Sequence, residues 1–327
     1  MSYTAMSCAA ASIFLQLPHV SVLFSRCSLV VLFLYGPAIS ATALVWQRYH
    51  RFLYVCVFVC LAVRAMQNIS TDGVAVRAVT SVDDELFVLL HRVDNQVAIY
   101  SINDYQLLRH LNVPGLNLDH TNDMTSCVKQ KCLYMSDSGD SCIHRYDLAS
   151  AAISQWPVPD KPCYLSVTSS CNLLVTCQGE PNKLVELSAD SGQCVREITL
   201  QSDVAPPYHS AELASCDFVV CHGVGDRDLN RVCVVGDDGK VTRSYGGHWG
   251  SEVGRLNLPC YLAVDKDSQF IFVADYLNDR VVLLSPTLEF VRHISEGLSR
   301  PTRLYFHLST RRLFVGQPGG GVFVIQL

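Results

Sequence analysis

Acidic residues and lysine are absent from the first 65 of the 327 residues, where the charged side chains are four arginines. The formal net charge of −5 therefore divides into +4 for residues 1–65 and −9 for residues 66–327. Nucleic-acid binding depends mainly on lysine and arginine facing phosphates, so an acidic body disfavours it. We divide the chain into a hydrophobic N-terminal segment, 1–65, and a body, 66–327.

The sequence also lacks the short motifs of common catalytic sites. There is no GxSxG nucleophile motif, no HExxH and no zinc spacing of cysteine and histidine. Residues 236–240 do not have the spacing of a phosphate-binding loop, and Val241 stands where that loop needs Ser or Thr. We therefore predict no cofactor, no metal ion and no catalytic residue, and the sequence leans against an enzyme while leaving the question open.

Cysteine is abundant, yet no CxxC pair occurs among the fifteen. Eleven lie in the body, mostly in or beside apolar runs, where a reduced cysteine behaves as a small buried hydrophobe. An odd count also fits poorly with a fully paired disulfide framework. The cysteines thus indicate free thiols and a reducing compartment.

Residues 27–47 are uncharged and mostly apolar, and about 20 such residues can cross a bilayer as a helix. One arginine, Arg26, precedes this candidate span, and Arg48 and Arg51 follow it. Because positive charge favours the cytoplasmic side, we predict a membrane-associated protein whose body faces the cytoplasm.

Residues 52–65 support a different localisation. A basic flank precedes the apolar run 52–63, and the small residue Ala65 follows, as in a signal peptide, although the position is internal. The body would then be secreted or luminal. In a further alternative, residues 1–65 are not part of the mature protein.

The body is organised around residues 258–295, which contain four short runs of β-branched, aromatic and other apolar residues separated by polar turns. The runs cover residues 261–264, 270–274, 280–284 and 290–294. Runs of this length between Asp, Asn, Pro and Ser predict strands. Four antiparallel strands in about 40 residues are typical of one blade of a β-propeller.

Similar groups of runs repeat along the body. The second run of each group begins near residues 86, 133, 173, 218, 270 and 313, at spacings of 40 to 52 residues. The sequence therefore predicts an all-β, six-bladed β-propeller of four-stranded antiparallel blades, monomeric, after a hydrophobic N-terminal segment. The sixth group has three runs, so we expect residues just before Val74 to supply its fourth strand and close the ring.

The fifth group resembles an NHL repeat, most clearly at Leu258-Pro259, at residues 262–265 and 272–275, and at Asn278 and Arg280-Val281. The resemblance covers about 66–327 and implies a six-bladed propeller similar to the C-terminal propellers of tripartite-motif proteins. The RING, B-box and coiled-coil parts of such proteins are absent, so ubiquitin-ligase activity is not implied. For Asp275, Asn278 and Arg280 we expect a structural role, because Asp and Asn side chains stabilise turns and Arg280 can pair with Asp275 or Asp279.

Inner strands of a propeller surround one channel, so residues near their first positions should meet at its mouth. These are Arg77, Asp123, Tyr164, His209, Tyr261 and Arg303. A Ca²⁺ hydrolase needs several converging oxygen ligands and a zinc lyase several histidines. The set offers one carboxylate, Asp123, and one histidine, His209. Arginine and tyrosine suit an anionic or polar group of a partner.

We therefore predict partner-binding residues at the channel mouth: Arg77, Tyr164, His209, Tyr261 and Arg303. Because a solvated mouth contributes little core, replacing both arginines should leave folding nearly unchanged. Trp249, in the long connection before the fifth group, is a second contact candidate if it is exposed, and packing under the loop is the alternative. The first function class is a non-enzymatic scaffold that binds a protein or peptide of unknown identity. A metal-dependent hydrolase or lyase at the channel mouth and an RNA-binding propeller are the alternatives.

Overall fold

The computed structural model describes residues 14–17, 20–25, 28–33, 65–91, 96–116, 120–158, 160–223, 229–295 and 297–327. The chain divides into two compact units, Met1–Cys60 and Leu61–Leu327. In the first unit, the described residues form one antiparallel sheet of β1 (Phe14–Leu17), β2 (Val20–Ser25) and β3 (Ser28–Phe33).

The candidate membrane span meets the described residues only in part. Residues 28–33 of it belong to β3, not to a helix, and the remainder of 27–47 lies outside the described residues, as does the signal-like run 52–63. Within the described ranges, no helix has the length and hydropathy needed to cross a membrane. Membrane attachment, the signal peptide and the cytoplasmic location stay predictions.

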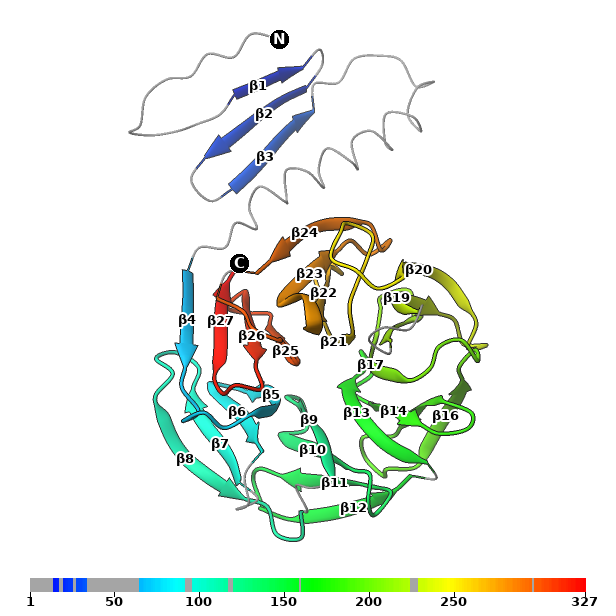
Figure 1. The fold of residues 1–327 in the computed structure, drawn as a ribbon. Helices are drawn as coiled ribbons and strands as arrows, with labels where there is room; N and C mark the ends of the chain where they lie inside the picture. Colours follow the sequence, from blue (N-terminus) through cyan, green and yellow to red (C-terminus); the bar gives the residue numbers. More distant parts are fainter. Residues whose placement is uncertain are drawn as a thin grey trace. The chain divides into compact units, whose positions relative to one another are not determined.

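The second unit is an all-β, six-bladed propeller, which confirms the predicted fold (Figure 1). Each blade is a sheet of four antiparallel strands, and the strands of a blade follow one another from the axis to the rim. In the described part of the chain, the one helical element is the 3₁₀ turn η1 (Tyr276–Asn278).

The first three blades have the following strands. Blade 1 contains β5 (Val76–Val82), β6 (Glu85–Leu90), β7 (Gln96–Ser101) and β8 (Leu107–Asn112). Blade 2 contains β9 (Thr121–Cys127), β10 (Cys132–Asp137), β11 (Cys142–Asp147) and β12 (Ile153–Pro157). Blade 3 contains β13 (Lys161–Val167), β14 (Leu173–Gln178), β15 (Lys183–Leu187) and β16 (Cys194–Thr199).

The last three blades complete the ring. Blade 4 contains β17 (Pro207–Glu212), β18 (Phe218–His222), β19 (Asn230–Val235) and β20 (Val241–Gly247). Blade 5 contains β21 (Pro259–Val264), β22 (Ile271–Asp275), β23 (Arg280–Leu284) and β24 (Phe290–Ile294). Blade 6 contains β25 (Arg303–His307), β26 (Arg312–Gly316), β27 (Val322–Gln326) and β4 (Ala65–Ile69).

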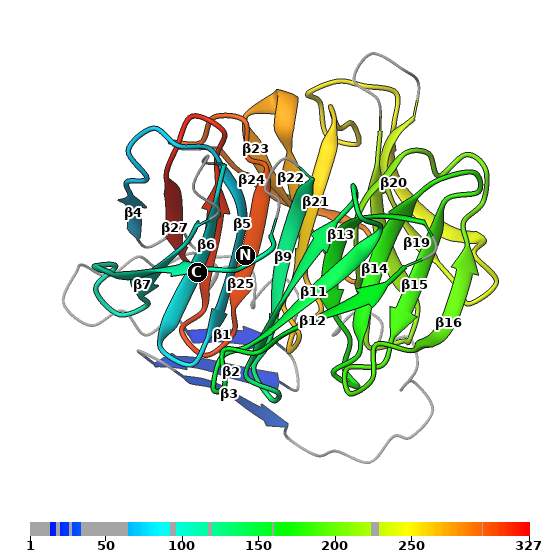
Figure 2. The same cartoon turned by 90° about the horizontal axis from the view of Figure 1, so that it is seen from below.

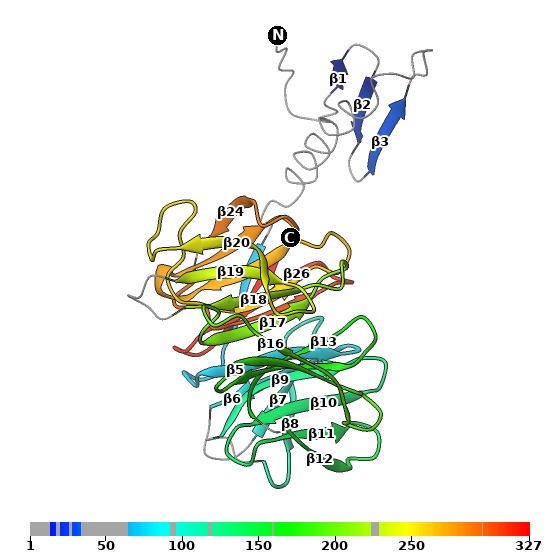
Figure 3. The same cartoon turned by 90° about the vertical axis from the view of Figure 1, so that its right-hand side faces the viewer.

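The ring is closed by the strand that the sequence predicts just before Val74. Strand β4 pairs antiparallel with the C-terminal strand β27, with Ile69 opposite Val322 and Ala65 opposite Gln326. Both ends of the body therefore lie in one blade, and β27 is not left as an open edge. The order from axis to rim can be followed in Figure 3 along β17, β18, β19 and β20 of blade 4.

The core lies between neighbouring blades. Phe87 of blade 1 packs in one cluster with Leu133 and Met135 of blade 2, and Tyr134 of blade 2 packs with Leu165 and Val175 of blade 3. Middle strands such as β6 and β10 are covered on both faces, which explains why they are continuous apolar runs and not alternating ones. In Figure 2 the inner strands β9, β13 and β21 lie toward the middle of the propeller and β16 at its rim.

The antiparallel order determines which loops share a face. Inner strands begin, second strands turn into third strands, and outer strands connect to the next blade, all on one side of the disc. We call this side the top face. It carries the first residues of the six inner strands and also the long connection between β20 and β21.

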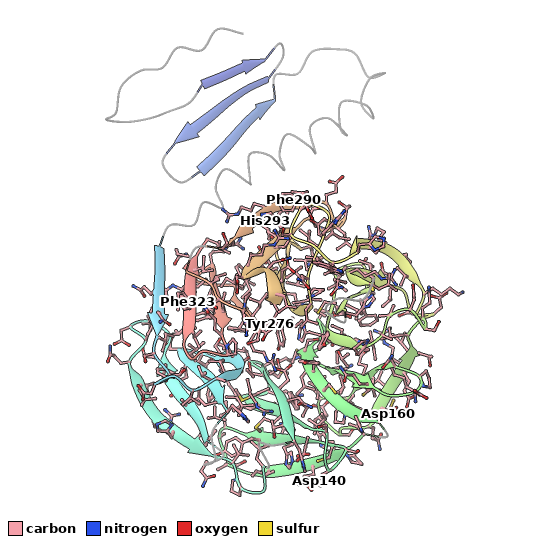
Figure 4. All side chains as sticks on the ribbon, viewed as in Figure 1. Asp140, Asp160, Tyr276, Phe290, His293 and Phe323 are labelled. Carbon is pink, nitrogen blue, oxygen red and sulfur yellow. The ribbon has the colours of Figure 1, made fainter. Side chains whose placement is uncertain are left out.

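Each blade is packed with side chains from the channel to the rim, as Figure 4 shows. Phe290 and His293 lie on the outer strand β24 with their rings 4.7 Å apart, and Tyr276 lies nearer the axis. None of the eleven body cysteines forms a disulfide in the structure. Most of them are buried, as expected for reduced core thiols.

Candidate functional site

The structure brings five of the six predicted mouth side chains into one cluster near the start of the inner strands. Asp123 and Tyr261 form its centre, although they lie 138 positions apart in the chain. The Tyr261 hydroxyl lies 3.1 Å and 3.0 Å from the two Asp123 carboxylate oxygens, and the Leu165 amide donates to Oδ2 at 2.9 Å. We call Asp123, Tyr164, His209, Tyr261 and Arg303 the channel cluster.

Asp123 is fully buried. Burial raises the pKa of its carboxyl group to about 7, and the nearby Arg303 charge and the hydrogen bonds limit that increase. The Arg303 Nε atom lies 3.9 Å from Asp123 Oδ1. Asp123 is therefore a carboxyl group that can exchange a proton near neutral pH.

His209 is buried and stacked on Tyr261, with ring centroids 3.9 Å apart. Its Nε2 donates to the Leu165 carbonyl at 3.0 Å, and its Nδ1 has no hydrogen-bond partner among the described residues. Burial lowers the pKa of His209 to about 3, so the imidazole is neutral at physiological pH.

The sequence predicted that the Arg303 guanidinium lies in a solvated channel mouth. In the structure, backbone carbonyls of the chain surround it instead. Its Nη1 donates to the Thr302 carbonyl at 2.8 Å, its Nη2 to the Asn122 carbonyl at 2.9 Å, and its Nε to the Arg77 carbonyl. Its guanidinium also lies over the rings of Tyr164 and Tyr261, at 5.4 Å and 5.3 Å. The chain's own carbonyls thus engage all three nitrogens, and Arg303 ties β25 to blades 1 and 2.

Arg77 takes part in this cluster through its backbone. Its side chain points to other partners: Nη1 donates to the Thr121 carbonyl at 2.6 Å and Nε to His91 Nδ1 at 3.0 Å. The predicted five residues therefore do not form a single set of free recognition groups. That they bind a partner stays a prediction.

A second feature of the top face is the connection between β20 and β21, which carries Trp249. The Trp249 side chain is 52% exposed, Val253 is 62% exposed, and Leu277 in the adjacent turn is 42% exposed. Large apolar side chains gathered at one place on a surface mark an interaction site more often than scattered ones do.

The backbone of this connection is fixed from below by blade 5. Arg280 donates to the Ser251 carbonyl at 2.6 Å and to the Arg255 carbonyl at 3.1 Å, and Asn278 donates to the Gly250 carbonyl at 2.8 Å. Both side chains also contact the buried carboxylate of Asp275, as the sequence-based structural role for these residues expects. The sequence predicted the structural role of Asp275, Asn278 and Arg280 and named Trp249 as a contact candidate. It did not show that Trp249 is exposed, or that Asn278 and Arg280 position its loop.

The fold and these sites define the class of the molecule: a six-bladed β-propeller whose channel is packed with polar and aromatic side chains. The sequence matches no protein-family model and no curated protein. Many solved structures match the fold.

Three of these structures differ in function. A gluconolactonase from Xanthomonas campestris is 15% identical with a TM-score of 0.60, covering 80% of this chain and 89% of its own. A streptogramin B lyase is 9% identical with a TM-score of 0.57, covering 80% and 97%. The WD40 β-propeller domain of Doa1 is 15% identical with a TM-score of 0.54, covering 79% and 95%. Identities this low show a shared fold alone.

Proposed function

We propose that this protein is a non-enzymatic propeller scaffold that binds a protein or peptide partner on its top face, with the Trp249 loop as the main contact. The observation that carries the proposal is the exposure of Trp249 and Val253 on a backbone that Arg280 and Asn278 hold in place. An aromatic anchor on a fixed loop loses little conformational entropy on binding, which is the usual property of an interface hot spot.

The resemblance to NHL propellers and the fold shared with a WD40 domain support a binding role, and the acidic body favours a protein over RNA. Arg77 and the channel cluster, at the start of the inner strands on the same face, would lie beside the bound partner. Membrane association through the N-terminal segment, with the propeller in the cytoplasm, belongs to the same proposal.

The second candidate function is hydrolysis or lyase chemistry in the channel. It rests on Asp123, whose raised pKa suits proton transfer, next to Tyr261 and the neutral His209. Asp123 is the one carboxylate in the predicted mouth set, which fits poorly with a Ca²⁺ hydrolase that needs six to eight oxygen ligands. The channel cluster is therefore better suited to stabilising the propeller.

The test is affinity capture from native extract with the full chain, followed by affinity measurement with the partner identified. Trp249→Ser should weaken that binding by about 30-fold or more, the scale of a hot spot. Leu108→Ser is the matched control, because Leu108 is similarly exposed but lies on β8 at the rim of blade 1. Equal binding by the wild type and Trp249→Ser would refute the proposal.

The second candidate function has a separate test. Loss of a hydrolase or lyase activity in Asp123→Asn, with partner binding unchanged, would support it.

A further inference from the structure

Blade 2 contains a buried group of three potential metal ligands away from the channel cluster. Asp137 is the last residue of β10, and Cys142 and His144 lie on β11. Asp137 is the direct cross-strand partner of Cys142, and residues 142 and 144 point to the same side of the strand. Their ligating atoms all lie within 4.8 Å of one another, and all three residues are buried.

Two of the three distances between these atoms agree with those that a tetrahedral zinc ion imposes. Cys142 Sγ lies 3.7 Å from His144 Nε2, which lies 3.2 Å from Asp137 Oδ2. Zinc–ligand bonds of about 2.3 Å to sulfur and about 2.0–2.2 Å to nitrogen or oxygen give roughly 3.5 Å and 3.3 Å for the same pairs. Sulfur and imidazole ligands favour zinc over calcium or magnesium.

The surroundings of Asp137 leave one carboxylate oxygen available. Its Oδ1 accepts hydrogen bonds from the amides of Gly139 and Asp140, both at 3.0 Å, which fix the side chain. Its Oδ2 faces His144 Nε2. Backbone donors that orient a carboxylate ligand are a common feature of metal sites. Asp140, in the same turn, lies away from the propeller axis (Figure 4).

His120 lies on the solvent side of this group. Its Nδ1 is 4.0 Å from Asp137 Oδ1, and its side chain is about half exposed. The ring lies directly against the turn, because a Cβ atom on Gly139 would be only 1.9 Å from His120 Nδ1. His120 is therefore the histidine that we consider as a fourth ligand beside the three buried residues.

Comparison with blade 5 gives independent support. There the residue opposite Asp275 is Arg280, and its guanidinium neutralises the buried carboxylate and holds the preceding loop. In blade 2 the corresponding partner of Asp137 is the thiol of Cys142. Among the described residues, the ion-pair partners of Asp137 are His120 and His144, so the arginine-type cation of blade 5 has no counterpart. A buried carboxylate normally has a positive partner.

The second ring nitrogen of His144 is compatible with both a zinc-bound and a zinc-free site. Among the residues that the structure describes, His144 Nδ1 has no hydrogen-bond partner. It stays unpaired whether Nε2 carries a proton that it donates to Asp137 or binds a metal ion.

We propose that Asp137, Cys142 and His144, with His120 as the fourth ligand, bind one Zn²⁺ ion at the top of blade 2. The ion has the role in this blade that Arg280 has in blade 5. It neutralises the aspartate and holds His120, the residue directly before β9. Binding releases the thiol proton of Cys142, because zinc binds the thiolate. The spacing of Asp, Cys and His over eight residues is not a known zinc motif, so the sequence alone gave no signal.

The experiment uses the full chain, loaded with Zn²⁺ or Co²⁺ and then desalted. The wild type should retain one zinc per chain, and its cobalt form should show the near-ultraviolet thiolate-to-metal band and the visible bands of a tetrahedral site. Cys142→Ala should lose the thiolate band and bind zinc at least 100-fold more weakly. Cys127→Ala, which changes another buried cysteine of blade 2, is the matched control and should behave as the wild type.

His120→Ala covers the possibility that Cys142→Ala does not fold, because an exposed side chain can be removed without disturbing the core. It should fold normally and bind zinc at least 10-fold more weakly than the wild type. A wild-type chain that retains no zinc, or a Cys142→Ala chain that keeps the thiolate band, would overturn the proposal. Undiminished zinc binding by His120→Ala would overturn the four-ligand assignment.

Discussion

Arg280 Nε lies 2.7 Å from Asp275 Oδ2, and both side chains are almost completely buried. The ion pair joins the end of β22 to the start of β23, and Asp275 Oδ1 also accepts from the Asn257 amide at 2.6 Å. One carboxylate thus connects the turn of blade 5 to the connection that carries Trp249. The stability of the blade and the position of the exposed tryptophan depend on the same contacts.

Replacing Asp275 should therefore destabilise the protein and displace the Trp249 loop. Asp275→Ala leaves the Arg280 guanidinium buried without its counter-charge, which typically costs about 3–5 kcal/mol. We expect a loss of that size in the free energy of unfolding, measured by urea denaturation. Asp267→Ala, an exposed carboxylate in the same blade, is the control and should have little effect. Equal midpoints for the two variants would contradict the structural role of the pair.

The blades were predictable because a propeller repeats a simple pattern: short apolar strands separated by polar turns at nearly constant spacing. The closing strand followed from counting, since the last blade had three strands of its own. The order of the strands also brought Asp123, Tyr261 and Arg303 to one end of the channel. Spacing could not show that the Arg303 donors are used by the carbonyls of Arg77, Thr302 and Asn122, because those contacts depend on how strands of different blades face one another.

The same limit applies to Asp137, Cys142 and His144. Their proximity depends on the pairing of β10 with β11, which places Asp137 opposite Cys142. A shift of one residue in that register would turn the two ligands of β11 to the other face of the sheet. The equivalence of Asp137 and Asp275, each at the end of the second strand of its blade, depends on the same pairing, as does the presence of Cys142 in the place of Arg280.

Removal of the closing strand should lower the thermal stability sharply. Strand β4 supplies the buried Ile69 and a full set of pairings with β27. Its loss removes several kcal/mol of burial and hydrogen bonding, and about 1 kcal/mol corresponds to 2–4 °C in a domain of this size. A chain of residues 74–327 should melt about 10 °C or more below a chain of residues 61–327 in calorimetry. Equal melting temperatures would show that β4 does not close the ring.

Asp123 should give a pH dependence of stability that is opposite to that of a usual aspartate. Its pKa is raised to about 7 by burial, so between pH 4 and 7 the folded state binds more protons than the unfolded state. The stability contributed by this group is present below pH 4 and is lost as the pH rises through 7. Relative to wild type, Asp123→Asn should gain stability over that window, by at most about 1.4 kcal/mol per pH unit. Urea denaturation of both proteins at several pH values measures this difference in the free energy of unfolding.

His209 provides the internal control for that experiment, because its contribution has the opposite sign. Burial lowers its pKa to about 3, so the folded state binds fewer protons than the unfolded state between pH 3 and 6.5. This contribution is present above pH 6.5 and is lost as the pH falls through 3. His209→Gln should therefore lose stability relative to wild type as the pH rises from 3 to 6.5. Parallel profiles for Asp123→Asn and His209→Gln would contradict both assignments.

The two mouth arginines should differ in their effect on folding. The sequence alone suggested that both could be replaced at little cost, but Arg303 donates to three backbone carbonyls and lies 3.9 Å from Asp123. In Arg303→Ala those carbonyls lose their donors and the buried Asp123 loses its nearby positive charge.

Leaving buried polar groups unpaired costs about 1–3 kcal/mol each, so we expect Arg303→Ala to lower the free energy of unfolding by at least about 3 kcal/mol. Arg77→Ala removes a side chain that is only partly buried, and its backbone carbonyl can still accept from Arg303. Its cost should be about 1–2 kcal/mol, for the loss of the two side-chain hydrogen bonds to the Thr121 carbonyl and to His91. Urea denaturation of the two single variants measures both values. Because Arg77→Ala should stay folded, it can also test whether the channel mouth contacts a partner. Weaker partner binding by folded Arg77→Ala would support that contact. Weaker binding by Arg303→Ala would not, because it would also reflect lost stability. Equal loss of stability in the two variants would show that the carbonyl contacts of Arg303 do not hold the blades together.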